Sequence, residues 1–262
     1  MARNICMTFA LVLLMTTAVW AAPTYNYPDT APAIGMQLSY GSVYGNNGAY
    51  KSDISLYGAW TDELLRHKVG LGLGLGFGRA SDNEDTNVFF DHIRADYYYT
   101  AWRMSFDQNN GGMALRVGTE LGLFTLRWNA FKADDLMIQP GMAFDVHWNM
   151  LFAWCYAGVK YEHLFYDYMQ PAFGNDRDLV TPVLGNTLGV YVYDRILALM
   201  VETSWRKMVY PVEGSSYIIM TPGMFYHSGA LLVGAGWEVG LNEFSRDYIG
   251  EVGLRIWAGY SF

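Results

Sequence analysis

Residues 68–78 read KVGLGLGLGFG, so glycine occupies every second position of this stretch and apolar side chains occupy the positions between. In a helix interior each glycine would cost up to about 1 kcal/mol relative to alanine, which argues strongly against a helix. In a strand, successive side chains point to opposite faces. The stretch therefore predicts a β-strand with one apolar face and one nearly bare face.

The same period of two returns in residues 112–122, 231–241 and 252–262. In each segment one set of alternate positions is apolar, and the other set mixes glycine with charged residues. The period alone leaves two alternatives open, because a water-soluble sandwich turns its apolar face inward and a membrane barrel turns it outward.

Segment length and spacing favour the membrane alternative. Most predicted strands are about 9–15 residues long, whereas strands in sandwiches centre on about 5–6 residues and a tilted membrane strand needs about 9–11. Short connections at 149–150 and 194–195 contrast with longer ones at 165–185 and 208–215, as in outer-membrane barrels. We predict an all-β fold, a transmembrane antiparallel up-and-down β-barrel of about 12 strands, within a range of about 10–14 and even in number. The predicted strands are residues 33–43, 52–60, 68–79, 89–104, 112–127, 136–148, 151–164, 186–193, 196–207, 216–227, 229–241 and 248–262.

The composition agrees with a membrane barrel. Aromatic residues make up 16% of the chain and charged residues also only 16%, whereas soluble domains carry about 25% charged residues. After residue 22 no apolar stretch is long enough for a spanning helix, which excludes a helical membrane protein. The net charge of -8 argues against a nucleic-acid partner.

The N-terminus predicts export. Arg3 precedes an apolar run of about 14 residues, and the small residues Ala21 and Ala22 follow, which is the pattern of a cleaved signal peptide. We therefore expect residues 1–22 to be a signal peptide and residues 23–262 to form a single transmembrane barrel domain. An uncleaved N-terminal anchor is the alternative.

Aromatic residues gather toward the ends of the predicted strands. Membrane barrels carry two such girdles at the levels of the lipid headgroups, whereas in a sandwich the same side chains would fill the core. The residues are Trp60, Tyr97 to Tyr99, Trp102, Trp128, Trp148, Tyr161, Phe165, Trp205, Tyr210, Tyr226, Tyr260 and Phe262.

The C-terminal segment, which ends in Tyr260-Ser261-Phe262, resembles the terminal strand of Gram-negative outer-membrane proteins. That strand has apolar residues at alternate positions and ends in Phe. The resemblance implies the cell outer membrane as location, and an insertion signal at Tyr260 and Phe262 that periplasmic chaperones and the barrel-insertion machinery read. Residues 220–248 resemble the closing hairpins of poorly characterised transporter-like outer-membrane proteins, a resemblance that names no substrate.

The histidines do not predict an enzyme. A serine hydrolase built on one strand needs Ser two residues from His, and none of His67, His92, His147, His163 and His227 has Ser two residues later. A triad assembled across strands stays open. We expect no catalytic residue, no metal and no cofactor.

The inward face offers the best indication of function. If the apolar faces meet lipid, charges of both signs line the lumen, and the bare face of residues 68–78 leaves space there. We predict a narrow passive channel for small solutes, in a monomer whose partner is outer-membrane lipid. The alternatives are a closed-lumen structural or surface-interaction barrel and a lipid-processing enzyme. The candidate lumen residues are His92, Arg94, Asp96, Arg116, Glu120, Asp145, His147, Glu202, Arg206, Glu238, Glu251 and Arg255, together with Lys51, Asp53, Lys160 and Glu162.

Overall fold

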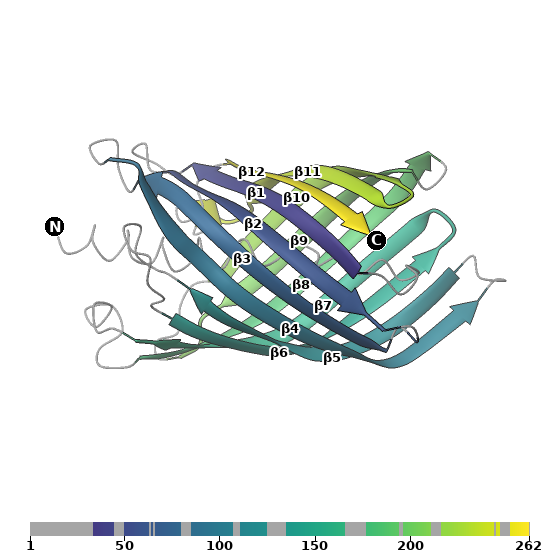
Figure 1. Ribbon diagram of the computed structural model, residues 1–262, viewed down its shortest axis with the longest axis horizontal. Helices are drawn as coiled ribbons and strands as arrows, with labels where there is room; N and C mark the ends of the chain where they lie inside the picture. The colour runs from purple at the N-terminus through teal and green to yellow at the C-terminus, as the bar shows by residue number, and fades with distance from the viewer. Residues whose placement is uncertain are drawn as a thin grey trace.

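The computed structural model describes residues 34–44, 50–62, 64, 66–79, 85–106, 111–124, 135–165, 177–193, 196–210, 216–243, 245–246 and 252–261. Its strands form one closed barrel in which each strand pairs antiparallel with its neighbours in sequence, and β1 pairs with β12 to close the ring (Figure 1). The strands are β1 (Ile34–Tyr44), β2 (Tyr50–Thr61), β3 (His67–Arg79), β4 (Asn87–Phe106), β5 (Gly111–Phe124), β6 (Asp135–Trp148), β7 (Leu151–Leu164), β8 (Asp178–Tyr193), β9 (Leu197–Lys207), β10 (Ser216–Ser228), β11 (Leu231–Gly240) and β12 (Val252–Ser261).

This architecture confirms the predicted up-and-down barrel of 12 antiparallel strands. The shortest strand has 10 residues and the longest has 20, so every strand is long enough to cross a bilayer at a tilt. Among the described residues, no helix has the length and hydropathy of a membrane-spanning helix.

The two ends of the barrel differ in their connections. Short connections follow β2, β4, β6, β8 and β10, and β1 begins and β12 ends at that same end, which we call the turn end. Two of its turns start with residues in the left-handed region, Asn149 at φ 53° and Gly229 at φ 56°, as tight hairpins require. The longer connections lie at the opposite end, the loop end. Short turns mark the periplasmic end of outer-membrane barrels.

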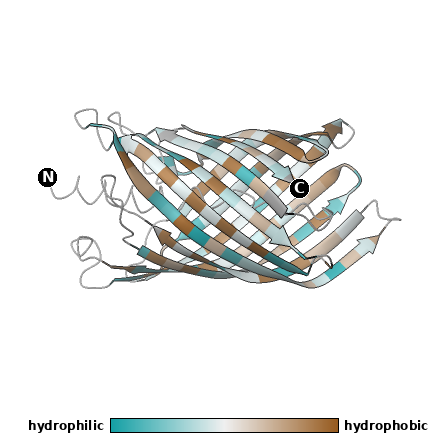
Figure 2. Cartoon of the chain, in the orientation of Figure 1, coloured by the Kyte–Doolittle hydropathy of each residue, from teal (hydrophilic) through white to brown (hydrophobic). Residues whose placement is uncertain are grey.

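The outer surface of the barrel is apolar. On β3 the side chains of Val69, Leu71, Leu73 and Leu75 are exposed, and the glycines between them face inward. The same alternation runs along the other strands, where apolar and polar residues follow one another (Figure 2). A water-soluble sandwich would bury this apolar set, so the structure settles the ambiguity of the period in favour of a lipid-facing exterior.

The start of β8 differs more from the prediction than the other described strand boundaries do. The sequence predicts a long loop over residues 165–185, but β8 begins at Asp178 and so includes the last part of that stretch. Pro182 lacks a backbone N–H and is unusual within a strand, which makes the stretch read as a loop. In the barrel Pro182 pairs with Val159 of β7, and the strand continues through it.

Candidate functional site in the barrel lumen

The inner face of the barrel carries charged side chains that are shielded from bulk water. Neighbouring strands contribute them at alternate positions, so they line the lumen from the turn end to the loop end. Glu251 lies outside the described residues. The structure places the other candidate residues on the inner face: His92, Arg94, Asp96, Arg116, Glu120, Asp145, His147, Glu202, Arg206, Glu238, Arg255, Lys51, Asp53, Lys160 and Glu162.

Side chains from β2 and β4 cover the bare face of β3. Lys51 Nζ lies 2.7 Å from Asp91 Oδ1, and Tyr57 donates a hydrogen bond of 3.0 Å to Asp96 Oδ2. The guanidinium of Arg94 lies over the Tyr57 ring, 4.6 Å from its centroid. The expectation that these glycines leave open space on the wall is therefore wrong. They leave room that side chains of the flanking strands occupy.

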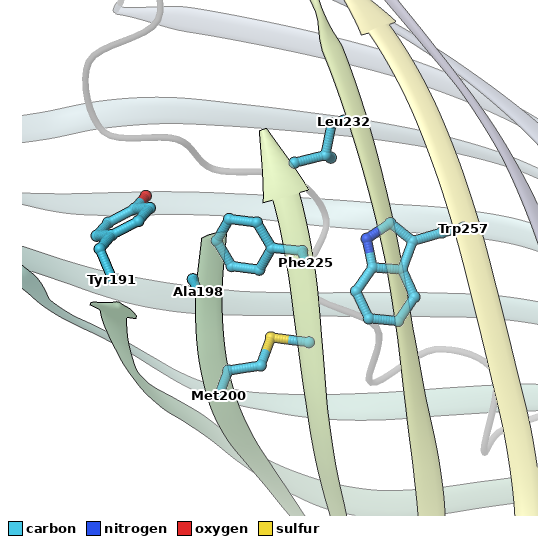
Figure 3. Close-up of a cluster of buried hydrophobic side chains, with 6 residues drawn as sticks. All are labelled: Tyr191, Ala198, Met200, Phe225, Leu232 and Trp257. Carbon is cyan, nitrogen blue, oxygen red and sulfur yellow. The ribbon is translucent and has the colours of Figure 1, made fainter. Parts of the chain in front are cut away.

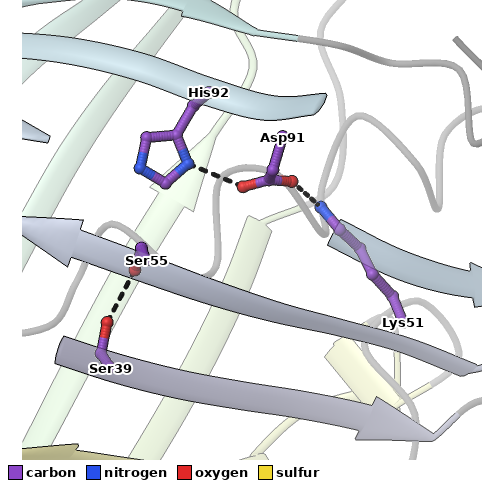
Figure 4. A network of polar contacts seen from close by, with 5 residues as sticks. All are labelled: Ser39, Lys51, Ser55, Asp91 and His92. Carbon is purple, nitrogen blue, oxygen red and sulfur yellow. Dashed lines mark hydrogen bonds and ion pairs between the residues drawn. The ribbon is translucent and has the colours of Figure 1, made fainter. Parts of the chain in front are cut away.

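A β-bulge in β4 brings an additional carboxylate into the lumen. Gly74 pairs with His92 whereas Leu75 pairs with Phe90, so Asp91 is the extra residue between them. Asp91 and His92 are both buried, and His92 Nδ1 lies 2.7 Å from Asp91 Oδ2 (Figure 4). Strict alternation would have placed the Asp91 carboxylate on the lipid-facing side, where burying a charge is costly.

Two serines lie beside this group. Ser39 and Ser55 are paired in register on β1 and β2, and their hydroxyls lie 2.7 Å apart (Figure 4). Ser55 is in turn paired with Gly74 of β3, which is paired with His92. The Ser55 hydroxyl is hydrogen-bonded to Ser39, and the Asp91 carboxylate is bonded to Lys51 and His92.

Further along the wall, charged groups of opposite sign pair between and within strands. Arg116 of β5 lies 2.9 Å from Asp145 Oδ2 of β6. On β7, Lys160 Nζ lies 2.5 Å from Glu162 Oε1. Arg255 of β12 donates to Glu238 of β11. These pairs hold ionised groups in a confined space, where leaving one charge without its partner is costly.

Several buried oxygens of the lumen, among them three on β4, β5 and β8, accept no hydrogen bond from any residue that the structure describes. Asp96 and Glu120 are paired in register on β4 and β5. Each accepts a hydrogen bond from a tyrosine on one oxygen, whereas Asp96 Oδ1 and Glu120 Oε2 have none. Thr187 Oγ1 on β8 is also buried and without a partner. Buried oxygens of this kind require a donor from water or a solute.

An apolar cluster lies on the inner face of the barrel near the turn end. The Phe152 ring packs against it, with its centroid 5.3 Å from that of Tyr191 and 5.7 Å from that of Phe225. The members come from β8, β9, β10, β11 and β12, and their side chains converge on the inside of the wall (Figure 3). We call this group the turn-end cluster; its buried members are Tyr191, Ala198, Met200, Phe225, Leu232 and Trp257.

The sequence prediction missed three buried charges on the inner face. Lys68 is in phase with the β3 glycines and could have been assigned to the inner face, Asp135 lies one residue before the predicted strand 136–148, and Asp91 occupies the bulge. Strict alternation places the Asp91 carboxylate among side chains that meet lipid, and this unfavourable position could have indicated the bulge. Among the described residues no three His, Cys, Asp or Glu side chains gather as metal ligands.

The predicted insertion signal and signal peptide are only partly within the described residues. The Tyr260 side chain lies on the outer face near the turn end and is 51% exposed. Phe262 and residues 1–22 lie outside the described residues. Reading of Tyr260 and Phe262 by the insertion machinery stays a prediction.

Comparison with known proteins gives likenesses in fold. No family model matches the chain, and no curated protein matches its sequence. The outer membrane channel COG4313 from Pseudomonas putida F1 is 12% identical with a TM-score of 0.53, covering 89% of this chain and 97% of that one. The translocator domain of autotransporter NalP from Neisseria meningitidis is 12% identical with a TM-score of 0.50, covering 93% and 92%.

A closed antiparallel barrel with an apolar exterior and a charged interior is the architecture of transmembrane β-barrels. The solved structures of this fold named above are outer-membrane barrels, as their descriptions state. The chain is an outer-membrane β-barrel, and its location is the outer membrane, as the resemblance of its C-terminal segment implies.

Proposed function

We propose that the protein is a narrow passive channel for small solutes. The observation that carries this proposal is that three buried lumen oxygens, Asp96 Oδ1, Glu120 Oε2 and Thr187 Oγ1, have no hydrogen-bond partner among the described residues. In a dry lumen each would cost about 1–3 kcal/mol. Water or a polar solute in the lumen removes this cost, so these groups favour a hydrated path over a dry plug.

The packing of the lumen supports a narrow path. The inward polar side chains of the described strands are mostly buried, and the turn-end cluster adds an apolar constriction. Selectivity then arises from width and from the charges on the wall. The likeness to a solved outer membrane channel agrees with this proposal.

In this proposal the barrel is a monomer in outer-membrane lipid, catalyses no reaction and uses no cofactor. A closed-lumen structural barrel is the second candidate, and the ion pairs across the wall, such as Lys51 with Asp91, favour it. Fully paired charges fill a lumen without requiring a path through it.

Solute uptake separates these two candidates. Proteoliposomes with the purified, heat-modifiable barrel are placed in isotonic arabinose or in the bulkier sugar raffinose, and swelling is followed by light scattering. A narrow channel admits arabinose much faster than raffinose, and protein-free liposomes admit neither. Equal exclusion of both sugars and of small ions would favour the closed barrel. Release of fatty acid from the liposome lipid would instead indicate the lipid-processing enzyme.

A further inference from the structure

Arg255 lies among three carboxylates from three other strands. Its guanidinium donates to Glu238 of β11. Asp53 of β2 and Glu202 of β9 also lie near enough to interact with it electrostatically. Arg206 of β9 is a second cation that acts on Glu202 and Glu238. The group therefore combines two arginines with three carboxylates that come from both sides of β12.

Glycines allow this convergence. Arg255 pairs in register with Gly41 on one side and with Gly236 on the other, so neither neighbour presents a side chain beside it. The Asp53 carboxylate occupies the space over Gly41, with Oδ1 2.9 Å from where a Cβ would lie. The bare positions turn the Asp53 carboxylate toward the strand that carries Arg255.

The charges of this group do not balance locally. Arg255 is bonded to Glu238, and Lys51, which also acts on Asp53, is in an ion pair with Asp91. Within the part of the chain that the structure describes, the side chains of Asp53 and Glu202 form no ion pair or hydrogen bond. Both are buried on the inner face.

The inner face as a whole also carries more negative than positive charges. On the described strands its cations are outnumbered by its carboxylates, and a confined, weakly polarisable wall strengthens the resulting field. The cations are Lys51, Lys68, Arg94, Arg116, Lys160, Arg206 and Arg255, and the carboxylates are Asp53, Asp91, Asp96, Glu120, Asp135, Asp145, Glu162, Glu202 and Glu238.

We propose that the lumen passes small monovalent cations in preference to anions, and that Asp53 and Glu202 are the residues that determine this preference. The inference rests on the proposed channel and names the class of solute that it selects. No three carboxylates or histidines of the described residues gather closely enough to hold a metal ion. The two carboxylates therefore act on mobile ions through their charge.

The test is the reversal potential of the purified barrel in a planar bilayer under a KCl gradient, at pH 9 to keep carboxyls ionised. The wild-type reversal potential is expected to lie toward the K⁺ equilibrium potential. The double variant Asp53→Asn, Glu202→Gln removes two negative charges with little change in side-chain size. Its reversal potential is expected to move away from the K⁺ equilibrium potential, to zero or toward the Cl⁻ equilibrium potential. Asp178→Asn is the matched control, because Asp178 lies on the outer face at the loop end and is about half exposed.

A second variant protects the test against misfolding of the first. Arg255→Gln removes the central cation and is expected to shift the reversal potential in the opposite direction, further toward K⁺. Each variant is first checked for heat-modifiable folding. Conductance that prefers Cl⁻ in the wild type, or is unchanged in both variants, would overturn the cation preference and leave the channel standing. A folded barrel with no conductance would overturn the channel itself, and this inference with it.

Discussion

Lys51 and Asp91 form an ion pair of 2.7 Å although they lie on β2 and β4, with β3 between them. The pair closes over β3 because that strand presents only glycine to the lumen between Gly70 and Gly78. The stretch of sequence that predicts the fold thus also determines which charges meet inside it.

The glycine face of β3 is expected to tolerate no side chain. A Cβ at Gly74 would lie 2.5 Å from His92 Nδ1, so Gly74→Ala must displace the imidazole and should destabilise the barrel by about 1–3 kcal/mol. At Gly185 of β8 an added Cβ meets its nearest atom, on Trp154, at an ordinary 3.6 Å. Gly185→Ala is therefore the control and should be neutral. Unfolding of both variants in guanidinium, followed by tryptophan fluorescence in detergent, measures the difference; equal stability would contradict the packing.

The Lys51–Asp91 pair is expected to show strong coupling. Asp91→Ala leaves the buried Lys51 ammonium without this partner and should cost about 3–5 kcal/mol of unfolding free energy. The double variant Lys51→Met, Asp91→Ala removes both charges and should recover much of that loss. A double-mutant cycle from denaturant unfolding gives the coupling energy. Additive effects of the two substitutions would show that the pair contributes nothing.

Asp62 in the turn between β2 and β3 is expected to make stability depend on pH. Its carboxylate accepts hydrogen bonds from the backbone N–H of His67 and Arg66 at 2.7 and 2.6 Å. The His67 bond is the larger cause that holds the pKa of Asp62 below its usual 3.8. Because the folded pKa is depressed, this stabilisation is complete above the unfolded pKa and is lost as pH falls through the folded pKa. Asp62→Ala should therefore lower the unfolding midpoint at pH 7 and have little effect near pH 2. An equal difference between the variant and the wild type at both pH values would show that the charge of Asp62 is not the cause.

Cys155 provides a direct test of which face meets lipid. Its side chain is exposed on the outer face of β7, four residues after the strand begins at Leu151, at a depth where the apolar band of the barrel is expected. In membranes a charged, water-soluble thiol reagent should fail to modify Cys155, whereas the same reagent should modify it in unfolded protein. Mass spectrometry of the Cys155 peptide measures the extent. Rapid modification in intact membranes would place this face in water.

The regular part of this fold could be predicted from sequence because alternation marks both faces at once. In residues 231–241, Leu231, Val233 and Trp237 alternate with Gly234 and Glu238, and the structure exposes the first set and buries the second. Counting such segments gives about 12 strands, and the pairing of β1 with β12 confirms a closed barrel of that number.

The parts that sequence could not predict are those where alternation breaks. Asp91 enters the lumen through a bulge that shifts the register by one residue, so the alternate positions that face inward differ on the two sides of the bulge. Because proline is unusual within a strand, the sequence prediction begins β8 at residue 186 and omits its first half, which contains Pro182. The convergence of Asp53, Glu202 and Glu238 on Arg255 depends on the closure of the ring between β1 and β12 and on the register of the strands, which alternation does not specify.

Single-channel conductance of the turn-end cluster variant tests the channel most directly. Phe225→Ala with Trp257→Ala removes two rings from the constriction, and Trp237→Ala, on the lipid-facing side of β11, is the control. We predict stable steps for the wild type in a planar bilayer, larger steps for the double variant and unchanged steps for the control. Folded, heat-modifiable barrels that give no steps in any of the three would contradict the channel and identify a closed structural barrel.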